Sequence, residues 1–187
     1  MKVLIQSLLF IVIVFLFAIT SDRLTKIENV PGSAMNSGSQ QMNERQFLSD
    51  VIAHHEGAIA MAYVALTNSS RPEIKDFANT IITMEKRNID TTYMWRRDWY
   101  GDSNHIFIDA IDPKITMIKD LGGKDENFDS RFLQAMIAHH EGAIKMLGEM
   151  LVPSTRGELR DMATTAIAGL SQDVVIMKQW LKEWYAQ

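Results

Sequence analysis

The chain has 187 residues, of which 47% are hydrophobic and 22% charged, a composition typical of one globular domain rather than of a disordered chain. Its net charge of -4 disfavours binding to a phosphate backbone, so we expect no nucleic-acid partner. Cysteine is absent, which excludes disulfides, cysteine-ligated zinc and thiol nucleophiles, and any soft-metal chemistry must draw on the 12 methionines.

The first predicted element is an apolar segment at the N-terminus. Residues 3–19 follow Lys2 and are apolar at all but two positions. Their length suits both the hydrophobic region of a signal peptide and a membrane-spanning helix. The sequence around Ala18 makes a poor signal-peptidase site, which favours an uncleaved anchor. We therefore expect an N-terminal hydrophobic helix in residues 1–21, acting as signal anchor or signal peptide, with residues 3–19 as the tether to the inner membrane.

A polar stretch follows this segment. Residues 22–43 end in a run of glycine, serine, asparagine and glutamine that has little apolar surface to bury. Such a composition is typical of a flexible linker. The folded domain is therefore expected over residues 44–187.

Four long helices are predicted in this domain. Apolar residues recur with helical period from residue 44, where Asn43 and Gln46 resemble a capping box. A second capping pattern contains a proline in the first helical turn, and Gly101 can end that helix. The helices are expected over about 44–67, from Ser70–Glu73 to Tyr100, over 129–151 and over 156–186, with a short helix after Pro113 between the second and third.

An internal repeat dominates the sequence. Ile52–Met61 returns 85 positions later as Ile137–Met146, with nine of ten residues identical, and the two copies hold four of the five histidines. The match extends to the ends of the hairpins, where Trp99 corresponds to Trp184. The repeats therefore span 44–101 and 129–187, and two helical hairpins of this length can bury their apolar stripes by forming a four-helix bundle.

The repeated motif places metal-binding side chains near the core. Residues on a helix advance by about 100° each, which puts Met61 near the direction of His54 and places both histidines of a pair on or beside the inward face. Gly57 and Gly142 follow the first histidine of each pair by three residues, and a helical glycine there indicates close helix approach or room for a ligand. Two histidine pairs facing each other across a bundle could share one cation.

Imidazole and thioether together form a soft-to-borderline ligand set. This set favours Cu(I), then Cu(II) or zinc, over magnesium, calcium or manganese. The chain lacks the Glu-x-x-His pattern of carboxylate-bridged di-iron bundles and the His-Glu-x-x-His pattern of zinc proteases. The alternative is that the histidines are buried and hydrogen-bonded without any metal, in a bundle that docks a partner protein.

The repeated Ile-Ala-His-His-x-Gly-Ala-Ile-x-Met, followed by a hairpin that ends in Trp-x-x-x-Trp-Tyr, resembles the family called domain of unknown function 305. The resemblance covers residues 44–187. It implies a ferritin-like four-helix bundle, secreted or membrane-anchored in bacteria, in a family that includes periplasmic copper-binding proteins. The family's second-helix methionine is matched by Met177 but replaced by Thr92 in the first copy, and a glutamine of that helix is replaced by Glu85 and by Leu170. The metal ligands that the resemblance implies are His54, His55, Met61, His139, His140, Met146 and Met177.

The sequence thus predicts an all-α, ferritin-like four-helix bundle that binds copper, with Cu(I) favoured and zinc as an alternative. We expect it to be exported, to reside in the periplasm or another extracytoplasmic compartment, and to act as a copper buffer, carrier or resistance factor without catalytic turnover. Two rivals stay open at this point. One is a ferritin-like metal-dependent oxidoreductase that uses the same histidines, and the other is the metal-free interaction module. The sequence does not identify a protein partner.

Overall fold

A computed structural model of the chain describes residues 37–102 and 113–185, with side chains described from residue 44 onwards. The predicted N-terminal hydrophobic helix and most of the predicted linker lie outside these residues. The described ranges contain five helices and no strand, which confirms the all-α class. The helices are α1 (Ser37–Asn68), α2 (Pro72–Tyr100), α3 (Pro113–Thr116), α4 (Phe128–Gly148) and α5 (Gly157–Tyr185).

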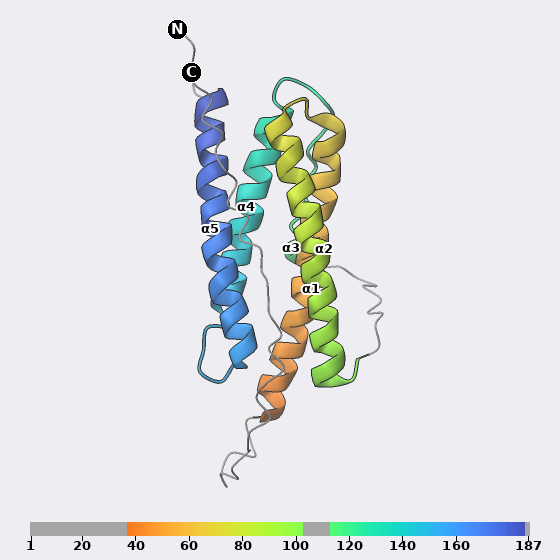
Figure 1. The fold of residues 1–187 in the computed structure, drawn as a ribbon, viewed down its shortest axis with the longest axis vertical. Helices are drawn as coiled ribbons and strands as arrows, with labels where there is room; N and C mark the ends of the chain where they lie inside the picture. Colours follow the sequence, from red (N-terminus) through yellow and green to blue (C-terminus); the bar gives the residue numbers. More distant parts are fainter. Residues whose placement is uncertain (1–36, 103–112, 186–187) are drawn as a thin grey trace. The chain divides into compact units, whose positions relative to one another are not determined.

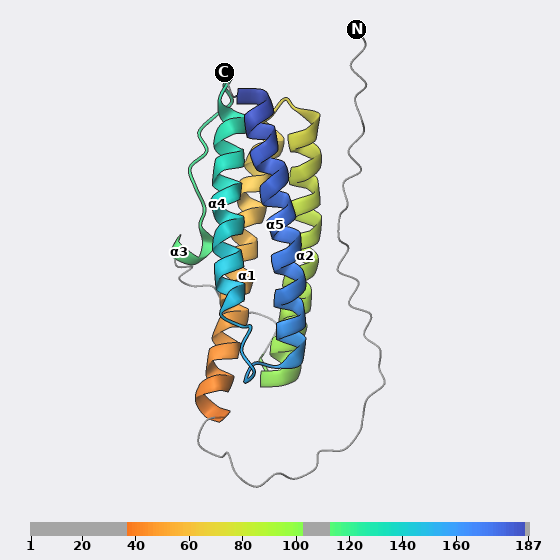
Figure 2. The same cartoon turned by 90° about the vertical axis from the view of Figure 1, so that its left-hand side faces the viewer.

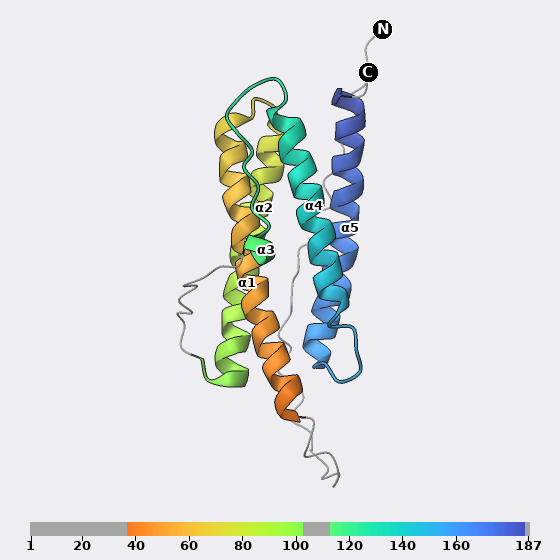
Figure 3. The same ribbon diagram turned by 180° about the vertical axis from the view of Figure 1, so that it is seen from behind.

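The four long helices form two antiparallel hairpins, α1 with α2 and α4 with α5, as the repeat predicts. Helices α1 and α5 run in one direction, and α2 and α4 run in the other (Figure 1, Figure 2). Helix α1 also packs against α4, which runs antiparallel to it, and the short α3 lies against α1 (Figure 3). None of the helices in the described residues combines the length and apolar character needed to cross a membrane.

The helix ends agree with the prediction in part. Helix α1 begins at Ser37, well before residue 44, so Asn43 lies inside the helix and the predicted capping box there is wrong. The glutamines at 40 and 41 and the methionine at 42 are good helix formers, which allows the helix to extend in this direction. Pro72 occupies the first turn of α2, and Gly101 ends that helix in the left-handed conformation with φ of 69°, as predicted.

The core consists of two apolar clusters stacked along the bundle. One contains α1 residues 58–65 with α4 residues 128–137, and the other contains α1 residues 47–51 with Leu147 of α4. Both clusters also include residues of α5. The histidine pairs of α1 and α4 fall between these two sets of residues along each helix. The repeated motif therefore lies at the middle of the bundle, bordered by apolar packing on both sides.

At one end of the bundle, an arginine of the second repeat binds residues of the first repeat. The guanidinium of Arg156 donates to the buried carboxylate of Glu44, with Nε and Oε2 3.0 Å apart, and lies 5.0 Å above the ring of Trp99. The backbone N–H of Arg156 donates to the other oxygen of Glu44 at 2.8 Å. Tyr100 donates its hydroxyl to the same carboxylate. These contacts tie the start of α5 to both helices of the first hairpin.

The same arrangement recurs with the repeats exchanged. Arg71 of the first repeat lies 4.4 Å above the ring of Trp184, and its Nε is 3.3 Å from Oδ2 of Asp129. Arg71 corresponds to Arg156, Asp129 to Glu44 and Trp184 to Trp99, each pair 85 positions apart. The bundle therefore has an approximate two-fold relation between its repeats. Asp129 lies inside the first turn of α4 rather than at its cap, because Asn127 occupies the cap position. Its carboxylate therefore binds the other hairpin instead of the helix terminus.

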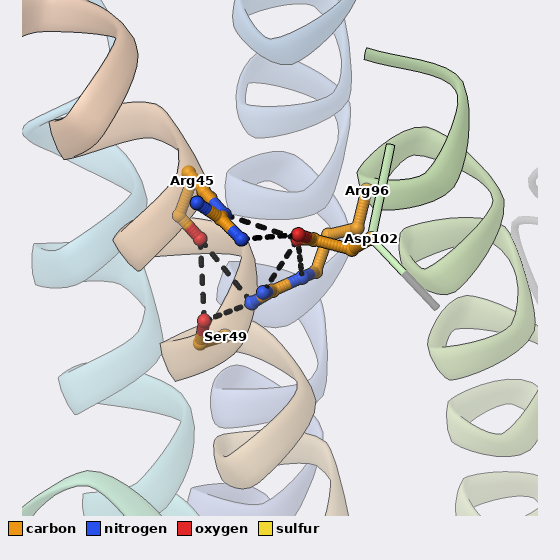
Figure 4. Close-up of polar contacts among 4 residues, drawn as sticks. All are labelled: Arg45, Ser49, Arg96 and Asp102. Carbon is orange, nitrogen blue, oxygen red and sulfur yellow. Dashed lines mark hydrogen bonds and ion pairs between the residues drawn. The ribbon is translucent and has the colours of Figure 1, made fainter. Parts of the chain in front are cut away.

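A buried arginine joins α1 to the end of α2 within the first hairpin. Arg96 donates Nη2 to Oδ2 of Asp102 at 2.7 Å and also hydrogen-bonds Ser49 of α1 (Figure 4). Arg45 pairs with the same carboxylate. Burial tends to raise the pKa of Asp102, but the hydrogen bonds from Arg45 and Arg96 outweigh it and lower that pKa. The network fixes the chain at the C-terminus of α2.

Candidate metal centre

The structure brings the first histidines of the two motifs into direct contact. His54 of α1 and His139 of α4 are 5% and 2% exposed, and their ring centroids lie 3.7 Å apart. Nε2 of His139 donates to the backbone carbonyl oxygen of His54 at 3.2 Å. This contact fixes the proton of a neutral His139 on Nε2 and leaves its Nδ1 with the lone pair. The facing pairs expected from the repeat are therefore present at the α1–α4 contact.

A carboxylate of α2 holds the second histidine of the first motif. Nδ1 of His55 lies 2.7 Å from Oε2 of Glu85, and Asn88 donates to the same oxygen at 3.1 Å. Burial alone would raise the pKa of Glu85, but the attraction and hydrogen bond of His55, with the hydrogen bond of Asn88, lower it to about 2. The carboxylate of Glu85 accepts a hydrogen bond from Nδ1 of His55, which orients the ring and leaves Nε2 as the nitrogen that could bind a metal.

The second motif uses a different carboxylate in a different way. Nε2 of His140 lies 3.5 Å from Oδ2 of Asp173, while Leu170 occupies the repeat position of Glu85. Asp173 is three residues further along α5, so it approaches the histidine from the next turn. The contact is longer than a strong charge-assisted hydrogen bond. The two halves of the site are therefore chemically unequal, with His55 held more firmly than His140.

Two imidazole nitrogens at this centre are buried without a hydrogen-bond partner among the described residues. They are Nε2 of His54 and Nδ1 of His140. A buried polar atom without a partner costs free energy, which a bound metal ion would recover. Burial, then the neighbouring His55, lowers the pKa of His54 to about 4; burial, then the neighbouring His54, lowers that of His139 to about 2. Neutral imidazoles with free lone pairs are the form that binds copper or zinc, so the residues fit such an ion.

The two motif methionines, Met61 and Met146, lie about two helical turns from the first histidines of their motifs. Met61 and Met177 are fully buried in the same apolar cluster, whereas Met146 packs against the other one. Seven residues separate each motif methionine from the first histidine, which is about 10 Å along the helix axis. Since α1 and α4 are antiparallel, Met61 and Met146 lie in opposite directions from the histidine contact. Ligation by these methionines stays a prediction.

The described residues contain no ready-made group of three or more histidine, aspartate or glutamate side chains placed to hold one ion. Sequence reasoning identified the histidines but missed the carboxylates of Glu85 and Asp173 that orient them. For Glu85 a signal was present, because it replaces the family's glutamine at a position expected to face the motif. For Asp173 there was none, because its position corresponds to Asn88 in the first repeat.

Comparison with known proteins gives one family and several similar structures. The family described as "Domain of unknown function (DUF305)" matches residues 44–181. No curated protein matches the chain. Among solved structures, the protein CopM in its Cu(I)-bound form is 29% identical, with a TM-score of 0.62, and the match covers 76% of this chain and 98% of CopM. The Cu(II)-bound form of CopM gives the same identity and a TM-score of 0.67, covering 76% and 97%.

A third similar structure is a putative secreted DUF305 protein from Streptomyces coelicolor. It is 20% identical, with a TM-score of 0.62, and the match covers 75% of this chain and 93% of that one. At this level of identity the likeness concerns the fold alone. It supports the four-helix arrangement of two hairpins.

Proposed function

The chain belongs to the family of domain of unknown function DUF305, and from this premise we propose that it binds copper, with Cu(I) favoured, through its two histidine pairs. The observation that carries the proposal is the contact between His54 and His139 at the middle of the bundle, with Nε2 of His54 and Nδ1 of His140 buried and unpartnered among the described residues. CopM, which is 29% identical, has been seen with Cu(I), Cu(II) and silver bound.

The protein side of the chemistry is coordination by neutral imidazoles. Glu85 orients His55 through its Nδ1, which leaves Nε2 as the nitrogen for a metal, and the peptide carbonyl of His54 holds His139 with Nδ1 unprotonated. Burial lowers the pKa values of His54 and His139 and so keeps these two rings neutral at physiological pH. Copper is the cargo in this proposal, so the site has to bind and release an ion rather than turn over a substrate.

The proposed setting is outside the cytoplasm. The apolar residues 3–19 support export and a membrane tether, since their length and position suit a signal peptide or an anchor. In that compartment a copper-binding bundle acts as a buffer, a carrier or a resistance factor. Met61, Met146 and Met177 stay in the predicted ligand set, at positions where they would bind an ion beyond the histidine contact.

Competition for Cu(I) tests the proposal. Under anaerobic conditions we expect the wild-type protein to withdraw Cu(I) from a chromophoric chelator, and the His54→Gln, His139→Gln double variant to lose most of this affinity. His105→Gln is the matched control, because that histidine lies outside both motifs and should not matter. Equal Cu(I) affinity in all three proteins would contradict the proposal. Absence of copper binding in the wild type would favour the metal-free interaction module.

The same titration with zinc separates the two metals. A neutral imidazole site accepts zinc, so binding alone does not decide between them. We expect Cu(I) to displace zinc from the wild-type protein, whereas a zinc protein would keep its metal under these conditions.

A further inference from the structure

The last residue of α3 and the residue after it occupy the space left by both glycines of the repeated motif. A Cβ atom added to Gly57 would overlap the carbonyl oxygen of Thr116 and lie 2.9 Å from its carbonyl carbon. A Cβ atom added to Gly142 would overlap the sulfur of Met117 and lie 2.9 Å from its methyl carbon. The close approach predicted at these glycines is thus made by Thr116 at the end of α3 and by Met117.

This segment crosses the contact between the histidines. Each glycine follows the first histidine of its motif by three residues, which is about 4.5 Å along the helix axis. Because α1 and α4 are antiparallel, Gly57 and Gly142 lie on opposite sides of the contact between His54 and His139. The carbonyl of Thr116 lies at Gly57 and the thioether of Met117 lies at Gly142. The chain between these two groups therefore passes beside the histidine contact.

The thioether of Met117 lies against Gly142, one helical turn of α4 from His139. Side chains three residues apart on one helix face have Cβ atoms about 5–6 Å apart, and the sulfur occupies the Cβ position of Gly142. The flexible methionine side chain bridges a remaining gap of this size by changing rotamer. Met117 is also only partly buried, whereas Met61 and Met177 are fully buried.

The backbone of Met117 is held in an unfavourable conformation. Its φ is 50°, in the left-handed region, which is sterically unfavourable for a residue other than glycine. A glycine or asparagine would adopt this conformation more easily. An apolar contact alone gives no reason for a methionine at such a position, so the side chain itself is the feature that the segment delivers to Gly142.

We propose that Met117 supplies a thioether ligand to the copper ion held at the histidine contact. The inference rests on the proposed function and adds a soft donor to its imidazoles. A thioether binds Cu(I) and Ag(I) much more strongly than zinc. Met117 thus makes the site selective for the reduced ion. The motif glycines are conserved between the two copies because this segment must reach the histidines.

Paired titrations of the full chain test the role of Met117. Met117→Leu keeps the size and apolar character of the side chain but removes the sulfur. We expect its Cu(I) affinity to fall by about tenfold or more while its zinc affinity stays within about twofold of the wild type. Met94→Leu is the matched control, because Met94 is an exposed methionine of α2 far from the motif in sequence, and it should leave both affinities unchanged.

A measurement on the wild-type protein keeps the inference testable if the variant is unstable. With methionine methyl groups labelled with carbon-13, stoichiometric Ag(I) should shift the Met117 resonance and leave that of Met94 in place. A wild-type protein that binds Cu(I) and Ag(I) without any shift at Met117, or a Met117→Leu protein with unchanged Cu(I) affinity, overturns the inference alone. A wild-type protein that binds neither ion overturns the proposed function and the inference with it.

Discussion

Acidification should destabilise the metal-free protein through the histidine contact. The rings of His54 and His139 are buried 3.7 Å apart, and their pKa values of about 4 and about 2 lie below the ordinary value of 6.5. Since the folded state binds protons less readily than the unfolded state, these histidines contribute stability that is fully present above pH 6.5. That stability is lost as the pH falls from 6.5 towards the folded-state values.

The magnitude follows from the same values. Each pKa unit corresponds to about 1.4 kcal/mol, so lowering the pH from 6.5 to 5 removes about 2 kcal/mol of stability for each histidine that stays neutral in the folded state. Both stay essentially neutral at pH 5, which gives a loss of about 4 kcal/mol as an upper value. Carboxylates contribute little in this window, because their unfolded-state pKa values lie near 4.

Urea unfolding of the metal-free full chain at pH 7.5 and pH 5, followed by circular dichroism, measures this loss. The wild-type midpoint should fall strongly between the two values, and the His54→Gln, His139→Gln double variant should show a much smaller fall. A wild-type free energy of unfolding that is the same at both pH values would refute buried, neutral histidines at this contact.

Substitutions of Glu85 and Gly57 test the surroundings of the histidines. Glu85→Leu, which copies the second repeat, should weaken Cu(I) binding by about tenfold because His55 loses the carboxylate that orients it, and Glu85→Gln should weaken binding less. Equal Cu(I) affinities of wild type and both variants in a competition titration would contradict this role of Glu85. Gly57→Ala should destabilise the protein by about 2 kcal/mol or more, because the new methyl group meets the main chain of Thr116. In Gly169→Ala the new methyl group meets nothing within 4 Å, so this control should stabilise α5 by up to about 1 kcal/mol. A melting temperature of Gly57→Ala at or above that of Gly169→Ala would contradict this prediction.

Local patterns in the sequence were sufficient for the helices and for the pairing of the histidines. Helical periodicity, Pro72 and Gly101 located the hairpin of the first repeat, and the 85-residue offset carried it to the second. The start of α1 was misplaced because a polar composition does not distinguish a linker from an exposed helix. The tethering of Arg156 to Glu44 was not foreseen, because it pairs residues 112 positions apart and depends on how the hairpins meet.

The residues that surround the histidines could not be predicted from the sequence, because they come from segments that meet only in the tertiary structure. An isolated methionine between two repeats has no periodic pattern, so nothing in the sequence indicated where Met117 would lie. Its position follows from the packing of α3 on α1. In the sequence, only the glycines of the two motifs indicate that contact. Gly57 and Gly142 were correctly recognised as positions of close approach, but the approaching segment could not be identified from the sequence.

The most direct measurement is the location of copper itself. Crystals of the Cu(I)-loaded full chain, kept anaerobic and measured on both sides of the copper absorption edge, give an anomalous map of the bound ion. We expect a copper peak about 2 Å from Nε2 of His54, with a second imidazole of the two motifs in its coordination shell. Copper bound only at sites remote from both histidine pairs would contradict it.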